Sequence, residues 1–234
     1  MIKILGSIKN IKEASIIAKY NFDIVDIKNI EDGALGYVGD EQVKAIASKF
    51  NQKTLSVTAG NQVHPNSYSM TNRIQLLDSL GVRYIKIGIF DTDYIKEHKL
   101  FLKRIASLNI KKVGVLFADK ALDINQIKNV CKLNYDGLMI DTINKSSKCT
   151  LDLLDNNLIN NFVEVCRKAN KFCGISGSMS YENIECAMKF KPDFIGYRGA
   201  LCSSTNRNDL EGYKCESIIK KMKYANQKMY LKAV

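Results

Sequence analysis

Five charged side chains stand at or just after the ends of short apolar segments, and their types suit carbonyl chemistry and proton transfer. Asp26 and Lys28 close the segment FDIVDIK, Lys86 lies within YIKIGIF, and Asp141 and Lys145 fall in MIDTINK. Crowded amines lower one another's pKa, and partial burial acts in the same direction. A lysine altered in this way can attack a carbonyl carbon while neighbouring carboxylates relay protons. The set therefore indicates imine formation, enolisation, aldol condensation or dehydration.

The spacing within these segments indicates which side chains share a face. Asp26 and Lys28 are two residues apart, so they lie on the same face if the segment is a strand, although a surface ion pair would have the same spacing. In YIKIGIF, alternation separates three isoleucines from Lys86. A lysine on the isoleucine face of a helix-covered strand would bury an unpaired ammonium, which is costly. We therefore expect Lys86 to point away from the helices.

Two glycine-containing segments near the C-terminus suggest an anion site. GISGSMS carries Gly177 and Ser178 at the expected start of a helix, and GYRGALCSS carries Arg198, Gly199 and Ala200 after an apolar segment. Backbone N–H groups at a helix start bind phosphate, and glycine permits close approach. Two ordinary glycine turns are the alternative. We predict that these five residues bind phosphate.

The elements that must position these residues recur along the whole chain. Apolar segments typical of buried strands span residues 2–8, 22–28, 54–59, 84–90, 112–118, 137–141, 172–177 and 193–199. Segments with apolar residues at helical spacing follow them, at residues 10–20, 40–50, 71–81, 94–108, 123–133, 156–169, 181–190 and 211–233. Gly81 stands where a helix should end.

Eight strand and helix units in this length predict a single (β/α)₈ TIM barrel, with one catalytic domain spanning residues 1–234. A dinucleotide-binding fold would need three spaced glycines after the first strand, but ILGSIKNIKEA contains one. Active sites of such barrels lie at the C-terminal ends of the strands, and phosphate commonly binds after the last two strands. The five charged residues and the glycine segments would then meet at one end of the barrel.

Composition narrows the classes of partner. The net charge of +11 is spread along the chain with no dense basic run, so we expect attraction of small phosphorylated metabolites rather than nucleic acid. The seven cysteines include no C-x-x-C pair, there are two histidines, and no metal site is expected. No segment is apolar enough for a membrane span or a secretory signal, so we expect a cytoplasmic protein. The oligomeric state stays open, and a homo-oligomer is compatible with the sequence.

With these residues assembled, the sequence resembles the (5-formylfuran-3-yl)methyl phosphate synthase family of methanofuran biosynthesis. The resemblance rests on DIVDIKNIEDGALG, YIKIGIF, YDGLMIDTINKSSKCTLDLLD, GISGSMSYENI and PDFIGYRGALC, which occur in order from about residue 3 to about residue 210. It implies a barrel lyase that condenses two molecules of glyceraldehyde 3-phosphate into a furan aldehyde bearing one phosphate. It further implies no metal and no organic cofactor.

The resemblance also implies roles for individual residues. Lys28 is similar to the Schiff-base lysine of the family, Lys86 and Lys145 to its other functional lysines, and Asp26 and Asp141 to its site carboxylates. On this interpretation Asp26 orients and deprotonates Lys28. Three alternatives stay open: another Schiff-base aldolase acting on a phosphorylated aldehyde, a basic nucleic-acid-binding protein, and a barrel that binds phosphorylated metabolites without turnover.

Overall fold

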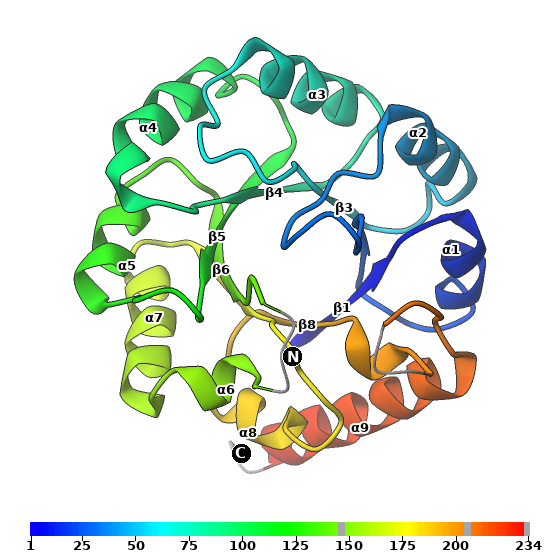
Figure 1. Cartoon of the computed structure of the whole chain (residues 1–234). Helices are drawn as coiled ribbons and strands as arrows, with labels where there is room; N and C mark the ends of the chain where they lie inside the picture. Colours follow the sequence, from blue (N-terminus) through cyan, green and yellow to red (C-terminus); the bar gives the residue numbers. More distant parts are fainter. Residues whose placement is uncertain (145–147, 204–206, 232–234) are drawn as a thin grey trace.

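The eight strands form a closed, all-parallel barrel in which each strand pairs with its neighbours in the sequence and the last pairs with the first (Figure 1). The computed structural model describes residues 1–144, 148–203 and 207–231. The strands are β1 (Lys3–Ile8), β2 (Ile24–Ile27), β3 (Leu55–Thr58), β4 (Tyr84–Gly88), β5 (Lys111–Phe117), β6 (Gly137–Asp141), β7 (Phe172–Ile175) and β8 (Phe194–Tyr197). The predicted (β/α)₈ fold is confirmed.

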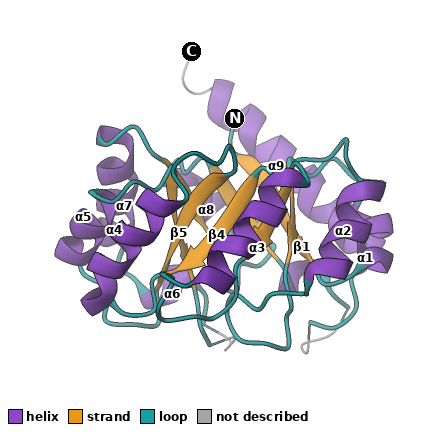
Figure 2. Ribbon diagram, turned by 90° about the horizontal axis from the view of Figure 1, so that it is seen from above, coloured by secondary structure: helices purple, strands orange, loops and turns teal. Residues whose placement is uncertain are grey.

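Helices surround the barrel on its outside (Figure 2). They are α1 (Ile11–Ile17), α2 (Asp40–Lys49), α3 (Tyr68–Ser79), α4 (Ile95–Arg104), α5 (Ile124–Cys131), α6 (Thr150–Leu153), α7 (Asn156–Lys168), α8 (Ile184–Lys189) and α9 (Gly212–Leu231). Two short 3₁₀ turns, η1 (Thr92–Tyr94) and η2 (Gly199–Leu201), follow β4 and β8. None of the helices in the described part of the chain is long and apolar enough to cross a membrane.

Local sequence explains most helix boundaries. The side chains of Asn10, Ser67 and Asp155 accept hydrogen bonds from backbone N–H groups in the first turns of α1, α3 and α7. Gly81 follows the end of α3 with φ +73°, a conformation that glycine adopts without strain, as its predicted role as a helix stop requires. Helix α3 begins three residues earlier than predicted, because the Ser67 cap precedes the apolar pattern.

Apolar side chains fill two separate regions. The larger lies between the strands and the helices, and the smaller lies inside the barrel. The inner cluster combines residues of β1, β2, β5, β6 and β8 with Ala34 and Leu35 from the loop that follows β2. This loop therefore folds back into the barrel. A backbone bridge between Asn29 and Gly36 joins its two ends.

The strand register decides which polar side chains become neighbours inside the barrel. Asp26 of β2 is level with Ser7 of β1 on one side and with Ser56 of β3 on the other. Thr58 of β3 is level with Lys86 of β4. Because side chains alternate along a strand, Ser56 and Lys86 face the same interior as Asp26. The inward side chains thus form a polar row within the otherwise apolar interior, made up of Ser7, Asp26, Ser56 and Lys86.

Candidate active site

The centre of the polar row is an ion pair between Asp26 and Lys86. The Nζ atom of Lys86 lies 2.5 Å from Oδ2 of Asp26, and the two residues are 0% and 2% exposed. Lys86 therefore points into the barrel, as the alternation in YIKIGIF predicts. At this separation the amine donates a short, charge-assisted hydrogen bond to the carboxylate. The pair can pass a proton between nitrogen and oxygen with little movement of either group.

Two serines hold the Asp26 carboxylate in place. The Ser7 hydroxyl donates to Oδ2 at 3.0 Å, and the Ser56 hydroxyl donates to Oδ1 at 2.8 Å. Together with Lys86, these donors occupy both oxygens of Asp26. Three hydrogen-bond donors offset the cost of burying this carboxylate and fix its orientation. Neither serine belonged to the predicted site, because a serine within an apolar run has no signal of its own before the register is known.

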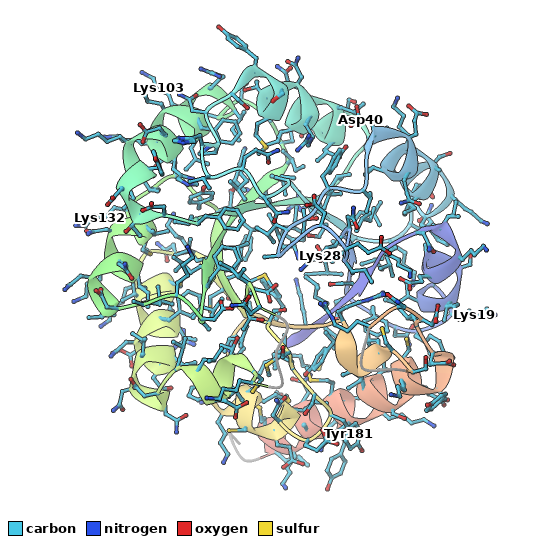
Figure 3. The ribbon with its side chains drawn as sticks, in the orientation of Figure 1. Lys19, Lys28, Asp40, Lys103, Lys132 and Tyr181 are labelled. Carbon is cyan, nitrogen blue, oxygen red and sulfur yellow. The ribbon has the colours of Figure 1, made fainter. Side chains whose placement is uncertain are left out.

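Lys28 forms the second lysine and carboxylate contact of the barrel. Its Nζ atom lies 3.9 Å from Oδ2 of Asp141, at the end of β6, and both residues are buried. That separation exceeds a hydrogen bond, so the contact is electrostatic. Lys28 lies inside the ring of strands, whereas Lys19 and Lys103 lie at the periphery of the molecule (Figure 3).

The pairing of charges differs from the expected one. Asp26 was predicted to orient Lys28, its neighbour on the same strand face. The ion-pair partner of Asp26 is instead Lys86, and Lys28 is paired with Asp141. The reason is the register through β3, which places Ser56 beside Asp26 and Thr58 beside Lys86 on one inward face. The four residues nonetheless form two neighbouring amine and carboxylate pairs.

Lys145, the third lysine of the predicted set, lies outside the described residues. The chain that leads toward it is held by Asp119, which follows β5. The Asp119 carboxylate accepts the backbone N–H groups of Ile143 at 2.8 Å and Asn144 at 2.6 Å. Asp119 thus fixes the start of the loop after β6 against the loop after β5.

The loop after β2 is fixed by Asn61, which follows β3. The Asn61 amide oxygen accepts the Leu35 N–H at 2.8 Å, and its amide nitrogen donates to the Asp32 carbonyl at 2.6 Å. The Thr58 hydroxyl donates to the Gly36 carbonyl at 2.6 Å. These bonds hold the loop after β2 against the C-terminal end of β3.

Gly177 and Ser178, two of the predicted phosphate ligands, lie in a turn and not at a helix start. Helix α8 begins only at Ile184, so the expected helix over 181–190 starts late. Gly177 has φ +95° and Ser178 has φ +50°. A Cβ atom on Gly177 would stand 2.5 Å from Oγ1 of Thr150, so only glycine permits this packing of the loops after β6 and β7.

The guanidinium of Arg198, also a predicted phosphate ligand, is committed to another partner. Its two terminal nitrogens donate to the Glu13 carboxylate of α1 at 2.5 and 2.9 Å, and one of them also donates to the Ser7 carbonyl at 3.1 Å. Both side chains are buried. This bidentate pair joins the end of β8 to α1. We therefore correct the prediction: the Arg198 side chain has a structural partner that the sequence did not reveal.

Arg207 is a second arginine near the same strand end, and sequence reasoning missed it. Its backbone is left-handed, with φ +64°, and its carbonyl accepts a hydrogen bond from Arg198 at 2.6 Å. Its side chain lies over Gly199, with Nε 4.0 Å from the position that a Cβ atom would take there. Burial lowers the pKa of Arg207, and the nearby Asp141 carboxylate opposes that shift. Arg198 thus positions Arg207 beside both Gly199 and Asp141.

Among the described residues, no group of three or more His, Cys, Asp or Glu side chains is arranged to hold a metal ion.

Solved structures with the same fold include two enzymes. They are 3-hexulose-6-phosphate synthase from Salmonella typhimurium (TM-score 0.64, 13% identity, 96% of this chain and 100% of that one) and phosphoribosyl anthranilate isomerase from Thermus thermophilus (TM-score 0.64, 9% identity, 95% and 99%). At these identities the likeness shows the fold alone.

Sequence relatives cover nearly the whole chain. The (5-formylfuran-3-yl)methyl phosphate synthase of Methanococcus aeolicus is 29% identical over 221 residues, which span 88% of this chain and 92% of the relative. The enzyme of the same name from Methanosarcina barkeri is 25% identical over 230 residues, which span 93% and 97%. The model of the 4-HFC-P synthase family matches residues 4–218. With that match over most of its length, this chain belongs to the 4-HFC-P synthase family.

Proposed function

We propose that this chain is a lyase that makes (5-formylfuran-3-yl)methyl phosphate from two molecules of glyceraldehyde 3-phosphate, through a Schiff base on Lys28. We further propose that the product serves a methanofuran-type cofactor. One observation carries the proposal: two buried lysine and carboxylate pairs, Lys86 with Asp26 and Lys28 with Asp141, stand inside one barrel. Family membership supports the identity of the product.

The atoms of the proposed reaction balance without an oxidant or reductant. Two three-carbon aldehydes supply the six carbons of the product, one phosphate is retained and the other is released. Two water molecules leave as well. The protein must therefore supply a nucleophile and several proton transfers, which is the chemistry of amines and carboxylates.

Lys28 is the proposed nucleophile. Its amine attacks a substrate carbonyl carbon, the C–N bond forms and the carbonyl oxygen leaves as water. Asp141, 3.9 Å from the amine, can accept the proton released on attack and return it to the departing oxygen. The resulting imine withdraws electrons and acidifies the adjacent C–H bonds.

The pair of Lys86 and Asp26 is the proposed acid and base for those C–H bonds. Ser7 and Ser56 fix the carboxylate, so that the lysine and the aspartate keep one relative orientation through successive proton transfers. Such preorganisation lowers the barrier because no group has to reorient during the reaction. Ring closure and dehydration each need further proton transfers, for which Lys145 is the remaining proposed group.

The substrate phosphate is proposed to bind at the loops after β7 and β8. Gly177, Ser178, Gly199 and Ala200 are the proposed backbone contacts, and the glycines permit close approach. Arg207, which lies over Gly199, is the proposed cation in place of Arg198. A guanidinium fits a phosphate with two parallel hydrogen bonds.

The experiment that tests the proposal uses glyceraldehyde 3-phosphate as the sole substrate. We expect a furan chromophore to form with release of one phosphate for every two aldehydes consumed, and the product to have the mass of (5-formylfuran-3-yl)methyl phosphate. A Schiff-base aldolase with another substrate would give no furan under these conditions. A sensor of phosphorylated metabolites would bind the aldehyde without consuming it.

A further inference from the structure

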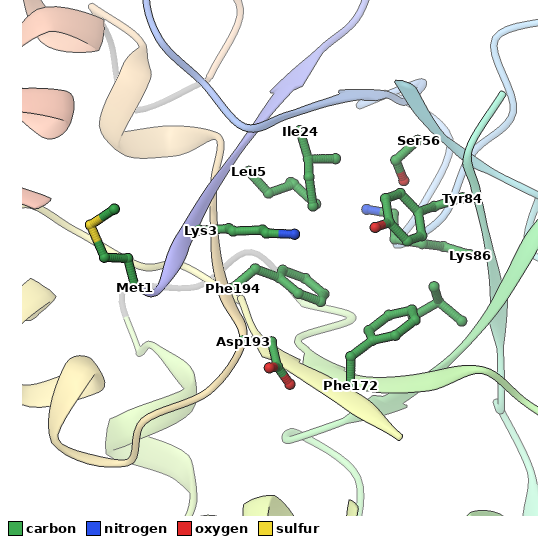
Figure 4. Close-up of a pocket in the computed structure, with 11 residues that line it drawn as sticks. Met1, Lys3, Leu5, Ile24, Ser56, Tyr84, Lys86, Phe172, Asp193 and Phe194 are labelled. Carbon is green, nitrogen blue, oxygen red and sulfur yellow. The ribbon is translucent and has the colours of Figure 1, made fainter. Parts of the chain in front are cut away.

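A cavity of about 180 Å³ opens at the end of the barrel opposite to the loops described above (Figure 4). Five residues of its lining are the first residues of their strands: Lys3, Ile24, Tyr84, Phe172 and Phe194. The N-terminal ends of barrel strands are ordinarily packed and serve stability, not chemistry. An open space at this end is therefore a candidate binding site for a small molecule.

Aromatic rings form one side of the cavity. Tyr84 and Phe172 meet edge to face with ring centroids 5.6 Å apart, and Phe194 lies 6.3 Å from Phe172. Glycines on the strands make room for two of these rings. A Cβ atom on Gly137 would stand 2.2 Å from the Phe172 ring, and one on Gly174 would stand 2.1 Å from the Phe194 ring.

The size of the cavity fits one small ring. A cavity of about 150 Å³ lined by apolar side chains admits benzene, so 180 Å³ accommodates a five- or six-membered ring with one small substituent. Leu5, Ile24 and Val113 complete the apolar lining. Flat rings pack against aromatic side chains in offset or edge-to-face geometry, which these walls offer.

One cation, Lys3, reaches into the cavity. The Lys3 side chain extends toward the centre of the space, between Leu5 and Phe194 (Figure 4). Its ammonium makes no ion pair within 4.0 Å among the residues that the structure describes. Asp193, which also lines the cavity, carries the opposite charge, and one of its carboxylate oxygens accepts the Cys173 N–H at 2.7 Å. The Lys3 ammonium inside the space is therefore the group with which a ligand carboxylate would pair.

The inner end of the cavity is formed by two residues of the active-site network. Ser56 and Lys86 line it, and both hydrogen-bond Asp26. A molecule in the cavity would contact Lys86, which belongs to the proposed acid and base pair. Occupancy can then change the packing around that pair.

We propose that this cavity binds a small aromatic carboxylate, with its ring against Tyr84, Phe172 and Phe194 and its carboxylate on Lys3. The site opens at the end of the barrel opposite to the proposed phosphate loops, and it shares Lys86 with the proposed acid and base pair. Its test needs no substrate, so the outcome does not depend on the function proposed above.

Calorimetric titration with four probes separates the ring from the charge. Benzoate and 2-furoate carry both features, cyclohexanecarboxylate lacks the aromatic ring, and benzyl alcohol lacks the charge. We expect benzoate or 2-furoate to bind with one site per chain. Cyclohexanecarboxylate and benzyl alcohol, which each lack one feature, should bind at least tenfold more weakly. If neither aromatic acid binds the folded protein at millimolar concentration, the cavity holds water only and the proposal is wrong.

Variants locate the bound probe. Lys3→Met should weaken benzoate binding at least tenfold, whereas Lys3→Arg, which keeps the charge, should retain most of it. Lys53→Met is the matched control, because Lys53 lies at the same end of the barrel but does not line the cavity. Val113→Phe should fill the space and abolish binding, with a thermal melt confirming that the variant folds. Binding that survives both Lys3→Met and Val113→Phe would place the probe elsewhere and overturn the proposal.

Discussion

Lys86 on β4 lies 2.5 Å from Asp26 on β2, although sixty residues separate them in the chain. The contact exists because β3 sets the register between the two strands and places Ser56 beside Asp26 and Thr58 beside Lys86. A lysine and an aspartate, each at the inward face of its own strand, thereby become one buried ion pair. This pair distinguishes the barrel interior from an ordinary apolar core.

Asp26→Asn should lower turnover by roughly two to four orders of magnitude, because the amide keeps the shape of the side chain but cannot accept the proton from carbon. Steady-state formation of the furan measures the effect. Ser56→Ala is the matched control: it removes one donor to Asp26 and leaves the carboxylate, so a loss of about tenfold is expected. An Asp26→Asn protein with turnover within threefold of the unaltered chain would remove Asp26 from the mechanism.

Arg198→Met and Glu13→Gln should each destabilise the protein by about 3–5 kcal/mol, because each leaves one charge of a buried bidentate pair without its partner. Urea unfolding gives the free energy directly. The double variant Glu13→Leu with Arg198→Met should recover part of the loss, since it removes both charges. If Arg198→Met instead unfolds like the unaltered chain and only weakens substrate binding, then Arg198 is a phosphate ligand after all.

Arg207→Ala should raise KM for the phosphorylated aldehyde about ten- to hundredfold, the effect of losing a hydrogen-bonded charge on a phosphate. The unfolding free energy should change little, because the bond that ties residue 207 to Arg198 uses its backbone carbonyl. The comparison of Arg207→Ala with Arg198→Met thus separates phosphate binding from stability. An unchanged KM for Arg207→Ala would refute the assignment.

The strands and most helices could be predicted from the sequence, because buried parallel strands are apolar runs and outer helices have a clear period. The inward direction of Lys86 also followed, from its alternation with three isoleucines. Helix α6 was missed because a four-residue helix has no period to detect.

The partners of the charged residues could not be predicted, because they depend on register and closure and not on local pattern. The contact between Asp26 and Lys86 depends on the pairing of β2 with β3 and of β3 with β4. Glu13 contacts Arg198 only because β8 pairs with β1 and closes the barrel. Glu13 stands on an outer helix, where a charged residue is ordinarily exposed. Arg207 lacked any sequence signal, since its position depends on a hydrogen bond from Arg198.

His98 should make the protein less stable as the solution becomes acidic. Its ring is buried, its Nδ1 lies 2.6 Å from the Tyr135 hydroxyl, and burial lowers its pKa from 6.5 to about 4. Between pH 6.5 and 4 the unfolded chain binds a proton at this residue and the folded chain does not. The stability present above pH 6.5 is therefore lost as pH falls toward 4, by roughly 3 kcal/mol in total.

The measurement is the free energy of unfolding in urea at several values of pH in that window. His98→Leu removes the titrating group and should flatten the pH dependence, whereas His64→Gln, at an exposed position, should leave it unchanged. Equal slopes for His98→Leu and the unaltered chain would show that other groups cause the acid sensitivity.

The most direct test of the account is borohydride reduction in the presence of glyceraldehyde 3-phosphate, followed by peptide mass mapping. We predict a reduced substrate adduct on the peptide that contains Lys28, and none there in Lys28→Arg, because a guanidinium keeps the charge but cannot form an imine. Lys28→Arg should still bind phosphate while furan formation disappears. An adduct on Lys86 or Lys145 would move the nucleophile to another lysine, and furan formation without any adduct would contradict covalent catalysis altogether.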